Sequence, residues 1–194
     1  MDFNAIKKIF QTVPNAKVAL FLRHAERESV IKALLTKKGI EASTAFGKEL
    51  KSLNVPVKIY SSPELRCVQT AELINREVSS MESEIILTSK LGKPGLQIRD
   101  NEKFQKLYES FNLVYKDIYK EWKAGKYYDI LRNPNELKEM SEVFINAKTE
   151  QNGVTLFVSQ SGTIANISYA LKIADYDTDK AEWVDFLDGF FIQL

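Results

Sequence analysis

The chain has 194 residues, which is enough for one domain with a substantial core, or one domain with an insertion, and too few for two independent domains. Lysine and arginine total 27 against 26 aspartate and glutamate residues, so the net charge of +1 gives no reason to expect nucleic acid or a membrane surface as a partner. The single cysteine, Cys67, cannot form an intramolecular disulfide, and no apolar run approaches the ~20 residues of a membrane span. The N-terminal residues also lack the apolar stretch of a secretory signal, so we expect a soluble, cytoplasmic protein.

Strands and helices are predicted to alternate through the first part of the chain. An amphipathic pattern predicts a helix over 3–12, and the apolar run that follows Pro14 and Asn15 predicts a strand over 17–22. Thr36 can cap a helix with apolar positions at helical spacing, namely Ile40, Ala42, Ala45, Phe46, Leu50 and Leu53. A strand over 55–60, a helix opened by Ser61, Ser62 and Pro63, and a strand over 84–88 complete this part.

Residues 92–150 are predicted to form a helical insertion or cap. One apolar stripe predicts a single helix that ends at Gly125, and we expect the stripe to pack against the core rather than shape a cofactor site. Its members are Phe104, Leu107, Tyr108, Phe111, Val114, Tyr115, Ile118, Tyr119 and Trp122. Asn133 and Pro134 predict the start of a further helix that runs to about Lys148.

The last part of the chain returns to the sheet. The apolar run over 154–158 predicts a strand, a helix is expected from Gly162 to about Ile173, and residues 189–194 predict a last strand at an edge. This alternation predicts an α/β fold, a three-layer αβα sandwich with a mainly parallel sheet. We therefore expect one domain over residues 1–194, with 92–150 as its insertion.

His24 is the only histidine, and it follows directly after the predicted strand over 17–22. A lone histidine beside an apolar segment is more often structural than catalytic, so its neighbours decide the interpretation. In a parallel sheet the loops after the strands converge at the carboxyl edge, which would bring together Arg23 with His24, residues 61–66, and residues 159–162. Two guanidinium groups and the N-terminus of a helix at Gly162 would then form an oxyanion site.

These residues carry a resemblance to a known family. It rests on three segments: 22–26 (Leu-Arg-His-Ala-Glu), 35–39 (Leu-Thr-Lys-Lys-Gly) with Ala42, Gly47 and Leu50, and 61–71 (Ser-Ser-Pro-Glu-Leu-Arg-Cys-Val-Gln-Thr-Ala). Together they resemble the histidine phosphatase, or phosphoglycerate mutase-like, superfamily. The resemblance covers roughly residues 17–90 and 153–194. It implies that His24 attacks phosphorus to form a phosphohistidine, while Arg23 and Arg66 hold the phosphoryl oxygens.

The sequence departs from the family pattern at its second histidine, where Gln160 stands, followed by Ser161. Gln160 can donate a hydrogen bond to phosphate but cannot carry the charge of an imidazolium. The missing charge should lower the rate of phosphoryl transfer by about a hundred- to a thousandfold. Either a natural member with altered catalysis or a substitution introduced to trap a complex fits this glutamine. Ser161, which adjoins the phosphate site, is too weak an acid to protonate a leaving alcohol. Glu26 is the nearest carboxyl candidate for that role, ahead of Asp100 and Glu102.

Two functions therefore follow from the sequence. The first is a phosphatase with weakened activity that hydrolyses a phosphomonoester or phosphohistidine, its substrate selected by the insertion and a rim of Lys93, Arg99, Lys103 and Lys106. The alternative is a catalytically impaired module that binds phosphate or a phosphorylated ligand. Under both functions, the expected partner is a small phosphorylated molecule or a phosphate or sulfate anion. No cofactor is expected, and one histidine and one cysteine offer no metal cluster. No G-x-x-x-x-G-K-S/T or G-x-G-x-x-G loop supports a nucleotide-binding domain.

Overall fold

The protein is described by a computed structural model that covers residues 2–28, 34–78, 84–149, 152–180 and 183–194. Its centre is a five-stranded sheet with the strand order β3-β2-β4-β1-β5. The strands are β1 (Lys17–Arg23), β2 (Val57–Ser61), β3 (Ile86–Leu87), β4 (Gly153–Ser159) and β5 (Gly189–Gln193). All neighbours are parallel except β5, which pairs antiparallel with β1 at the edge of the sheet. The mainly parallel sheet predicted from the alternating pattern is confirmed.

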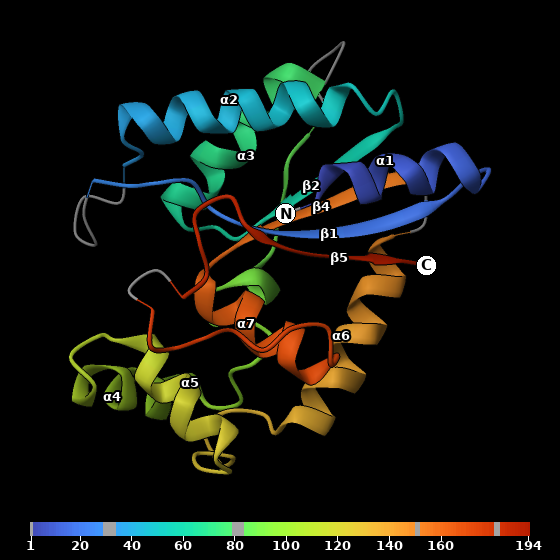
Figure 1. Ribbon diagram of the computed structural model, residues 1–194. Coiled ribbons are helices and arrows are strands. Elements are labelled where there is room, and N and C mark those ends of the chain that lie inside the picture. The colour runs from blue at the N-terminus through green and yellow to red at the C-terminus, as the bar shows by residue number, and fades with distance from the viewer. Residues whose placement is uncertain (1, 29–33, 79–83, 150–151, 181–182) are drawn as a thin grey trace.

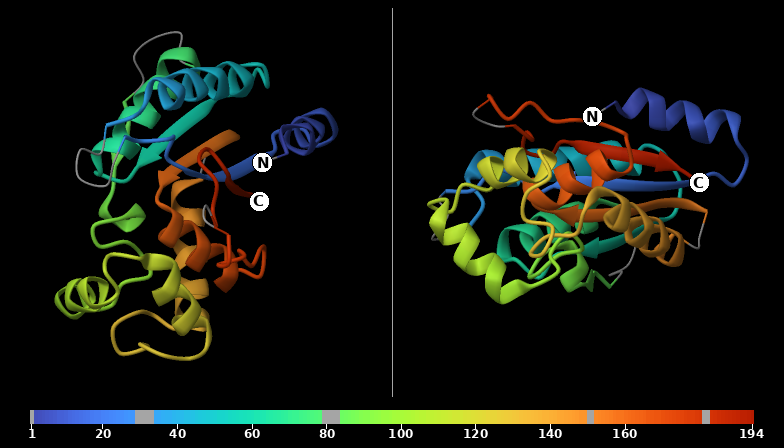
Figure 2. Two further views of the ribbon diagram at one scale, coloured as in Figure 1. Left: turned by 60° about the vertical axis from the view of Figure 1, so that its left-hand side comes forward. Right: turned by 90° about the horizontal axis from the view of Figure 1, so that it is seen from below.

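Helices cover both faces of this sheet, so the αβα sandwich is also confirmed (Figure 1). One face carries α1 (Phe3–Thr12), α2 (Lys37–Lys51) and α3 (Leu65–Val78), and the other carries α6 (Pro134–Lys148) and α7 (Ser161–Ala170). The short η1 (Ser89–Leu91) leads from β3 to α4 (Asn101–Ser110) and α5 (Tyr115–Lys123). These two helices lie beyond α7, away from the sheet (Figure 2).

The aromatic stripe predicted as one helix is two helices, which corrects the expectation for residues 101–124. Between α4 and α5 the backbone turns through Asn112 and Leu113, whose φ angles are 52° and 63°. The turn is closed because the N–H of Val114 donates to the carbonyl of Phe111 at 2.9 Å. The helical spacing of the apolar residues continues across this turn. Asn112, unlike proline or glycine, gives no strong signal of a helix end in the sequence, so one helix was predicted.

Other elements differ from prediction at their ends. β2 begins at Val57 rather than Val55, β3 has two residues rather than five, and α7 ends at Ala170 before Lys172, whose φ is 59°. Ile40, assigned to the buried face of its helix, is 44% exposed. The cap at Thr36 is confirmed, because its hydroxyl accepts the N–H of Gly39 at 3.0 Å. Asn133 and Glu136 form the capping box that begins α6.

The core is divided by the sheet into two clusters. Phe21 and Phe157 stack at 4.6 Å on the face covered by α6 and α7, and this cluster continues through Trp122 and Tyr119 into α5. Ile6, Leu50 and Ile74 belong to the cluster under α1, α2 and α3. Among the described residues, no helix has both the length and the apolar composition needed to cross a membrane.

Candidate active site

A cavity of about 580 Å³ lies where β1, β2 and β4 end. Its lining residues come from 23–27 after β1, from 64–66 at the start of α3, from 92–115 between η1 and α5, and from 160–163 at the start of α7. The three segments that the sequence predicts to converge do so: Arg23, His24, Arg66, Gln160 and Ser161 all line this one cavity. Parallel strands place their carboxyl ends at one edge, and this arrangement gathers the loops there.

The backbone around His24 is fixed from two sides. Its N–H donates to the carbonyl of Ser159 at 3.0 Å, which joins the end of β1 to the end of β4. The next N–H, of Ala25, donates to the hydroxyl of Thr70 on α3 at 3.0 Å, and that hydroxyl donates to the carbonyl of Arg66 at 2.7 Å. Thr70 therefore ties the backbone next to His24 to the backbone of Arg66.

The hydrogen bonds of the His24 ring assign a role to each nitrogen. Nδ1 lies 2.8 Å from the carbonyl of Ala25, so Nδ1 carries the proton and donates it. Nε2 accepts from Nε of Arg66 at 3.1 Å and so carries a lone pair. The pKa of the imidazole is lowered to about 3, chiefly by burial, since His24 is only 3% exposed. The Ala25 carbonyl opposes this shift, and the charges of Arg66, Arg23 and Arg27 contribute to it. The ring is therefore neutral at physiological pH, with a nucleophilic nitrogen in the cavity.

Arg23 and Arg27 bring positive charge to the same side of the cavity. The Arg23 guanidinium stacks 4.0 Å above the Phe186 ring, and its Nη1 donates to the carbonyl of Val184. Those contacts hold the guanidinium, which is 7% exposed, against the wall rather than in bulk water. Both arginines lower the pKa of His24, because their positive charges disfavour protonation of the imidazole.

Arg66 joins His24 to an internal carboxylate. While its Nε donates to His24, its Nη1 donates to Oε2 of Glu64 at 2.8 Å. The other oxygen of Glu64 pairs with Lys93 Nζ, also at 2.8 Å. The Glu64 side chain is 13% exposed, so this carboxylate sits largely out of solvent. Its single negative charge offsets part of the positive charge of Arg66 and Lys93.

The start of α7 supplies the opposite wall. Gln160 is the N-cap residue, and its side chain makes no capping hydrogen bond to the first turn, so its amide is directed elsewhere. A Cβ at Gly92 would lie 2.7 Å from Nε2 of Gln160, which places the amide against the backbone of that loop. Gly162 permits the close approach of α5, because a Cβ there would lie 2.6 Å from the Tyr115 ring. The N-terminus of α7 thus faces the cavity, with the partial positive charge of a helix end.

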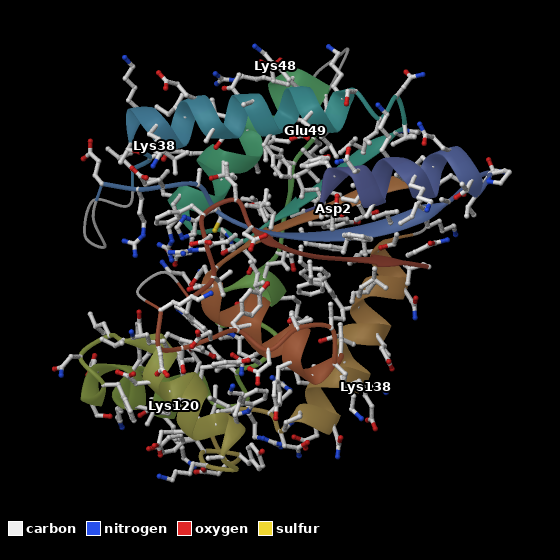
Figure 3. The ribbon with its side chains drawn as sticks, viewed as in Figure 1. Asp2, Lys38, Lys48, Glu49, Lys120 and Lys138 are labelled. Carbon is white, nitrogen blue, oxygen red and sulfur yellow. The ribbon has the colours of Figure 1, made fainter. Side chains whose placement is uncertain are left out.

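Several carboxylates and cations proposed from the sequence lie outside the cavity. Glu26 accepts from Thr36 at 3.0 Å and pairs with Lys38 at 3.3 Å at the start of α2. Figure 3 shows Lys38 at the N-terminal end of α2, at the opposite end of the view from Lys120 on α5. Asp100 caps α4 and Glu102 pairs with Lys106.

The proposed rim of basic residues is corrected in the same way. Of its four members only Lys93 lines the cavity. Arg99 pairs with Glu136, whereas Lys103 lies 3.7 Å from Asp129 and Lys106 lies 3.1 Å from Glu102. The first two pairs join a loop to α6 and α4 to a loop, and the third lies within α4.

Sequence reasoning missed Arg27, Glu64 and the lining from α4 and α5. Glu64 lies within the motif segment 61–71, two residues before Arg66, and Arg27 directly follows the segment 22–26. Their spacing from Arg66 and His24 could have identified them. Phe104 belongs to the core cluster and Tyr108 and Tyr115 pack against it, as predicted, but all three also line the cavity. Nothing in a periodic stripe separates residues that face a core from those that face a cavity.

Cys67, on α3 next to Arg66, is buried. It is 0% exposed, and burial raises the pKa of its thiol to about 12, so it does not supply a thiolate. In the described part of the chain no group of three or more histidine, cysteine, aspartate or glutamate side chains is arranged to hold a metal ion.

Comparisons with known proteins agree with this architecture. Residues 19–181 match the profile of the histidine phosphatase superfamily (branch 1). No curated protein matches the chain in sequence.

Among solved structures, a phosphoglycerate mutase from Bacillus anthracis str. Sterne is similar with a TM-score of 0.60 and 17% identity, covering 95% of this chain and 90% of its own. A phosphoserine phosphatase from Entamoeba histolytica, in complex with 3-phosphoglyceric acid, has a TM-score of 0.56 and 18% identity over 91% of this chain and 89% of its own. A mycobacterial glucosyl-3-phosphoglycerate phosphatase has a TM-score of 0.53 and 15% identity, over 92% and 89%. At these identities the likeness concerns the fold.

Proposed function

Because the chain belongs to the histidine phosphatase superfamily, with a profile match over residues 19–181, we propose that it is a phosphatase in which His24 forms a phosphohistidine intermediate. The observation that carries this proposal is the neutral His24 ring, with its Nε2 lone pair in a cavity beside the Arg66 guanidinium. The substrate is a phosphomonoester or a phosphohistidine. We expect turnover to be weak, because Gln160 supplies no positive charge to the transition state.

In the first step, the Nε–H of Arg66 turns from Nε2 of His24 to a phosphoryl oxygen, and the freed Nε2 lone pair attacks phosphorus. An N–P bond forms as the P–O bond to the leaving group breaks, and Nδ1 keeps its proton and its bond to the Ala25 carbonyl. Arg23, Arg27 and Arg66 hold the phosphoryl oxygens, together with Ser161 and the N-terminus of α7. Gln160 adds an amide donor without a charge.

In the second step, water attacks the phosphoryl group and breaks the N–P bond. Inorganic phosphate leaves, the water proton goes to solvent or to the phosphate, and the Nε2 lone pair returns. The same cations stabilise the charge in both displacements because the phosphoryl oxygens occupy the same place in each.

Protonation of the leaving oxygen is the weak point of this site. The one carboxyl among the described lining residues is Glu64, which already accepts from Arg66 and Lys93, so the proposal gives it no role as an acid. Glu26 lies outside the cavity and receives no such role either. Water then supplies the proton, without the 10²- to 10⁴-fold contribution typical of a positioned acid. Substrates with good leaving groups should be hydrolysed fastest.

Hydrolysis of p-nitrophenyl phosphate by the full chain and by His24→Ala tests the proposal. We expect the substitution to lower kcat by at least about three orders of magnitude, because loss of a nucleophile removes the whole covalent route. Equal rates would overturn the proposal. Circular dichroism of both proteins guards against a folding defect, and Gln11→Ala, in the exposed part of α1, is the control variant.

A catalytically impaired binding module is the second candidate, and Glu64 together with Gln160 favours it. An internal carboxylate on Arg66 and an uncharged amide in place of an imidazolium both reduce stabilisation of the transition state more than they obstruct binding. In that case phosphate or vanadate raises the melting temperature while no turnover of p-nitrophenyl phosphate is detected.

Two broader expectations accompany the proposal. We infer a reducing compartment, the cytoplasm, from the single buried thiol of Cys67. The division of residues 1–194 into one domain with 92–150 as its insertion stays a prediction. The placement of α4 and α5 beyond α7 supports it (Figure 2), whereas α6 packs on the sheet as part of the core.

A further inference from the structure

The chain directly before β5 forms a wall behind Arg23. Residues 183–188, in the red stretch that leads into β5, lie beside the end of β1 (Figure 1). The carbonyl of Val184 accepts from Nη1 of Arg23, and the carbonyl of Asp188 accepts its backbone N–H at 2.8 Å. Between these two contacts, the centroid of the Phe186 ring lies 4.0 Å from Cζ of Arg23. Because an arginine side chain has several rotatable bonds, contacts from one segment on both its backbone and its guanidinium restrict where the charge can lie.

The segment 183–188 is itself anchored on both faces of the sheet. Trp183 is 9% exposed and belongs to the cluster that includes α5, where its ring lies 5.0 Å from that of Tyr119. Leu187 packs against the other cluster, the one under α1, α2 and α3, and its φ of 56° turns the chain there. Phe186 lies between these two anchors. Its place beside Arg23 is therefore set by the fold before any ligand binds.

The Phe186 ring can hold Arg23 without competing for its contacts to phosphate. An aromatic ring attracts a cation through its face, whereas the N–H groups of a guanidinium that bind phosphoryl oxygens point outward in the guanidinium plane. Arg23 is one of the residues that line the cavity, and Phe186 is not, so the ring lies behind the arginine. A contact with a ring also adds no opposite charge, unlike the contact of the Glu64 carboxylate with Arg66.

The same ring adjoins His24. The centroids of the Phe186 and His24 rings are 5.8 Å apart, with an interplanar angle of 52°. An apolar ring at this distance helps to exclude water from the imidazole, which is 3% exposed. Phe186 lies outside residues 19–181, which match the profile of the superfamily, so that profile assigns the ring no role.

We propose that Phe186 is a positioning residue, whose ring sets the Arg23 guanidinium and the His24 imidazole to face one phosphoryl group. The inference rests on the proposed function, because that function places a phosphoryl group at His24. Removal of the ring should weaken the hold on phosphate by about tenfold, the order expected for a cation–aromatic contact that is shielded from water. The anchors at Trp183 and Leu187 should keep the segment folded.

Calorimetric titration of the full chain with inorganic phosphate tests this role. Phe186→Leu keeps an apolar side chain but removes the ring face, and should raise the dissociation constant about tenfold. Phe186→Tyr keeps the ring and should stay within about twofold of the parent. Phe191→Leu is the matched control, because Phe191 is also half-buried but packs in the cluster under α1, α2 and α3. It should leave the dissociation constant unchanged.

A double-mutant cycle separates positioning of Arg23 from general packing. In an Arg23→Gln background the ring has no guanidinium to hold, so Phe186→Leu should change the dissociation constant of phosphate by less than about twofold. A full further loss in that background overturns the positioning role. So does a loss from Phe186→Leu in the parent that is no larger than the loss from Phe191→Leu.

Nuclear magnetic resonance tests the contact with His24 independently of phosphate and of Arg23→Gln. His24 is the only histidine, so the signals of its ring protons are unambiguous. The ring current of Phe186 should shift them, so Phe186→Leu should move these signals and Phe191→Leu should not. Signals that Phe186→Leu leaves in place overturn the inference. Failure of the parent to bind either phosphate or vanadate overturns the proposed function itself, whatever the Phe186 variants do.

Discussion

The two ends of the cavity are built in different ways. At the sheet end, charged side chains stand at the end of β1 and at the start of α3. Hydrogen bonds among β1, β4 and α3 fix the backbone there. At the far end, neutral side chains come from a loop and from helices α4 and α5, and are held by contacts within the insertion. In the proposed function, the sheet end carries out the chemistry on phosphorus and the far end faces the leaving group. A fold of this kind can keep the first end while varying the second.

Restoring a charge at the sheet end should have the largest effect. Gln160→His places an imidazole at the N-cap of α7, where its protonated form can stabilise the charge of the transition state. We expect hydrolysis of p-nitrophenyl phosphate to increase roughly a hundred- to a thousandfold, with a gain that declines as pH rises through the pKa of the new imidazole.

Gln11→His adds an imidazole far from the cavity and should leave the rate unchanged. If Gln160→His gives no gain at any pH between about 5 and 8, where imidazole titrates, the uncharged amide is not what limits turnover. The far end of the cavity would then become the place to look for that limit.

The buried ring of His24 should make stability depend on pH. Burial lowers its pKa from 6.5 to about 3, so between those values the unfolded chain binds a proton that the native protein does not. The free energy of unfolding should therefore fall on acidification through this window, by about 1.4 kcal/mol for each pH unit. Urea unfolding of the parent and of His24→Gln, at several pH values in phosphate-free buffer, isolates the contribution of this ring. Equal acid sensitivity of the two proteins would show that the ring is already protonated in the native state.

Removing the internal carboxylate should have a smaller effect. Glu64→Gln deprives Arg66 and Lys93 of a charged partner and removes the repulsion between Glu64 and a bound anion. We expect inorganic phosphate to bind about tenfold more tightly, as measured by calorimetry. Glu142→Gln, which alters an exposed pair with Lys138 on α6, is the matched control. Weaker binding would mean instead that Glu64 is needed to orient Arg66.

The sheet end was predictable because its residues are local to strand ends. An apolar run followed by Arg23 and His24 predicts both the strand and the exit of the ring, and parallel topology predicts which loops meet. Proline and serine marked the start of α3 well enough to place Arg66 on it. The same reasoning placed Gln160 and Ser161 at the opposite wall.

The far end was not predictable, because its contacts join residues distant in sequence. Gln97 reaches the cavity through bonds to Thr163 and Arg132, which no local pattern encodes. The break at Asn112 and Leu113 redirects α5, so that Tyr115 approaches Gly162. The strand β3 is short and pairs only through two residues, and a β-propensity pattern cannot determine where such pairing stops.

The direct test of the central claim is the stereochemistry at phosphorus during hydrolysis. An isotopically chiral thiophosphate ester is hydrolysed in isotope-enriched water, and the configuration of the released thiophosphate is then determined. Attack by His24 followed by attack by water is two in-line displacements, and predicts overall retention. Inversion would mean that water attacks phosphorus directly, and would contradict a phosphohistidine on His24.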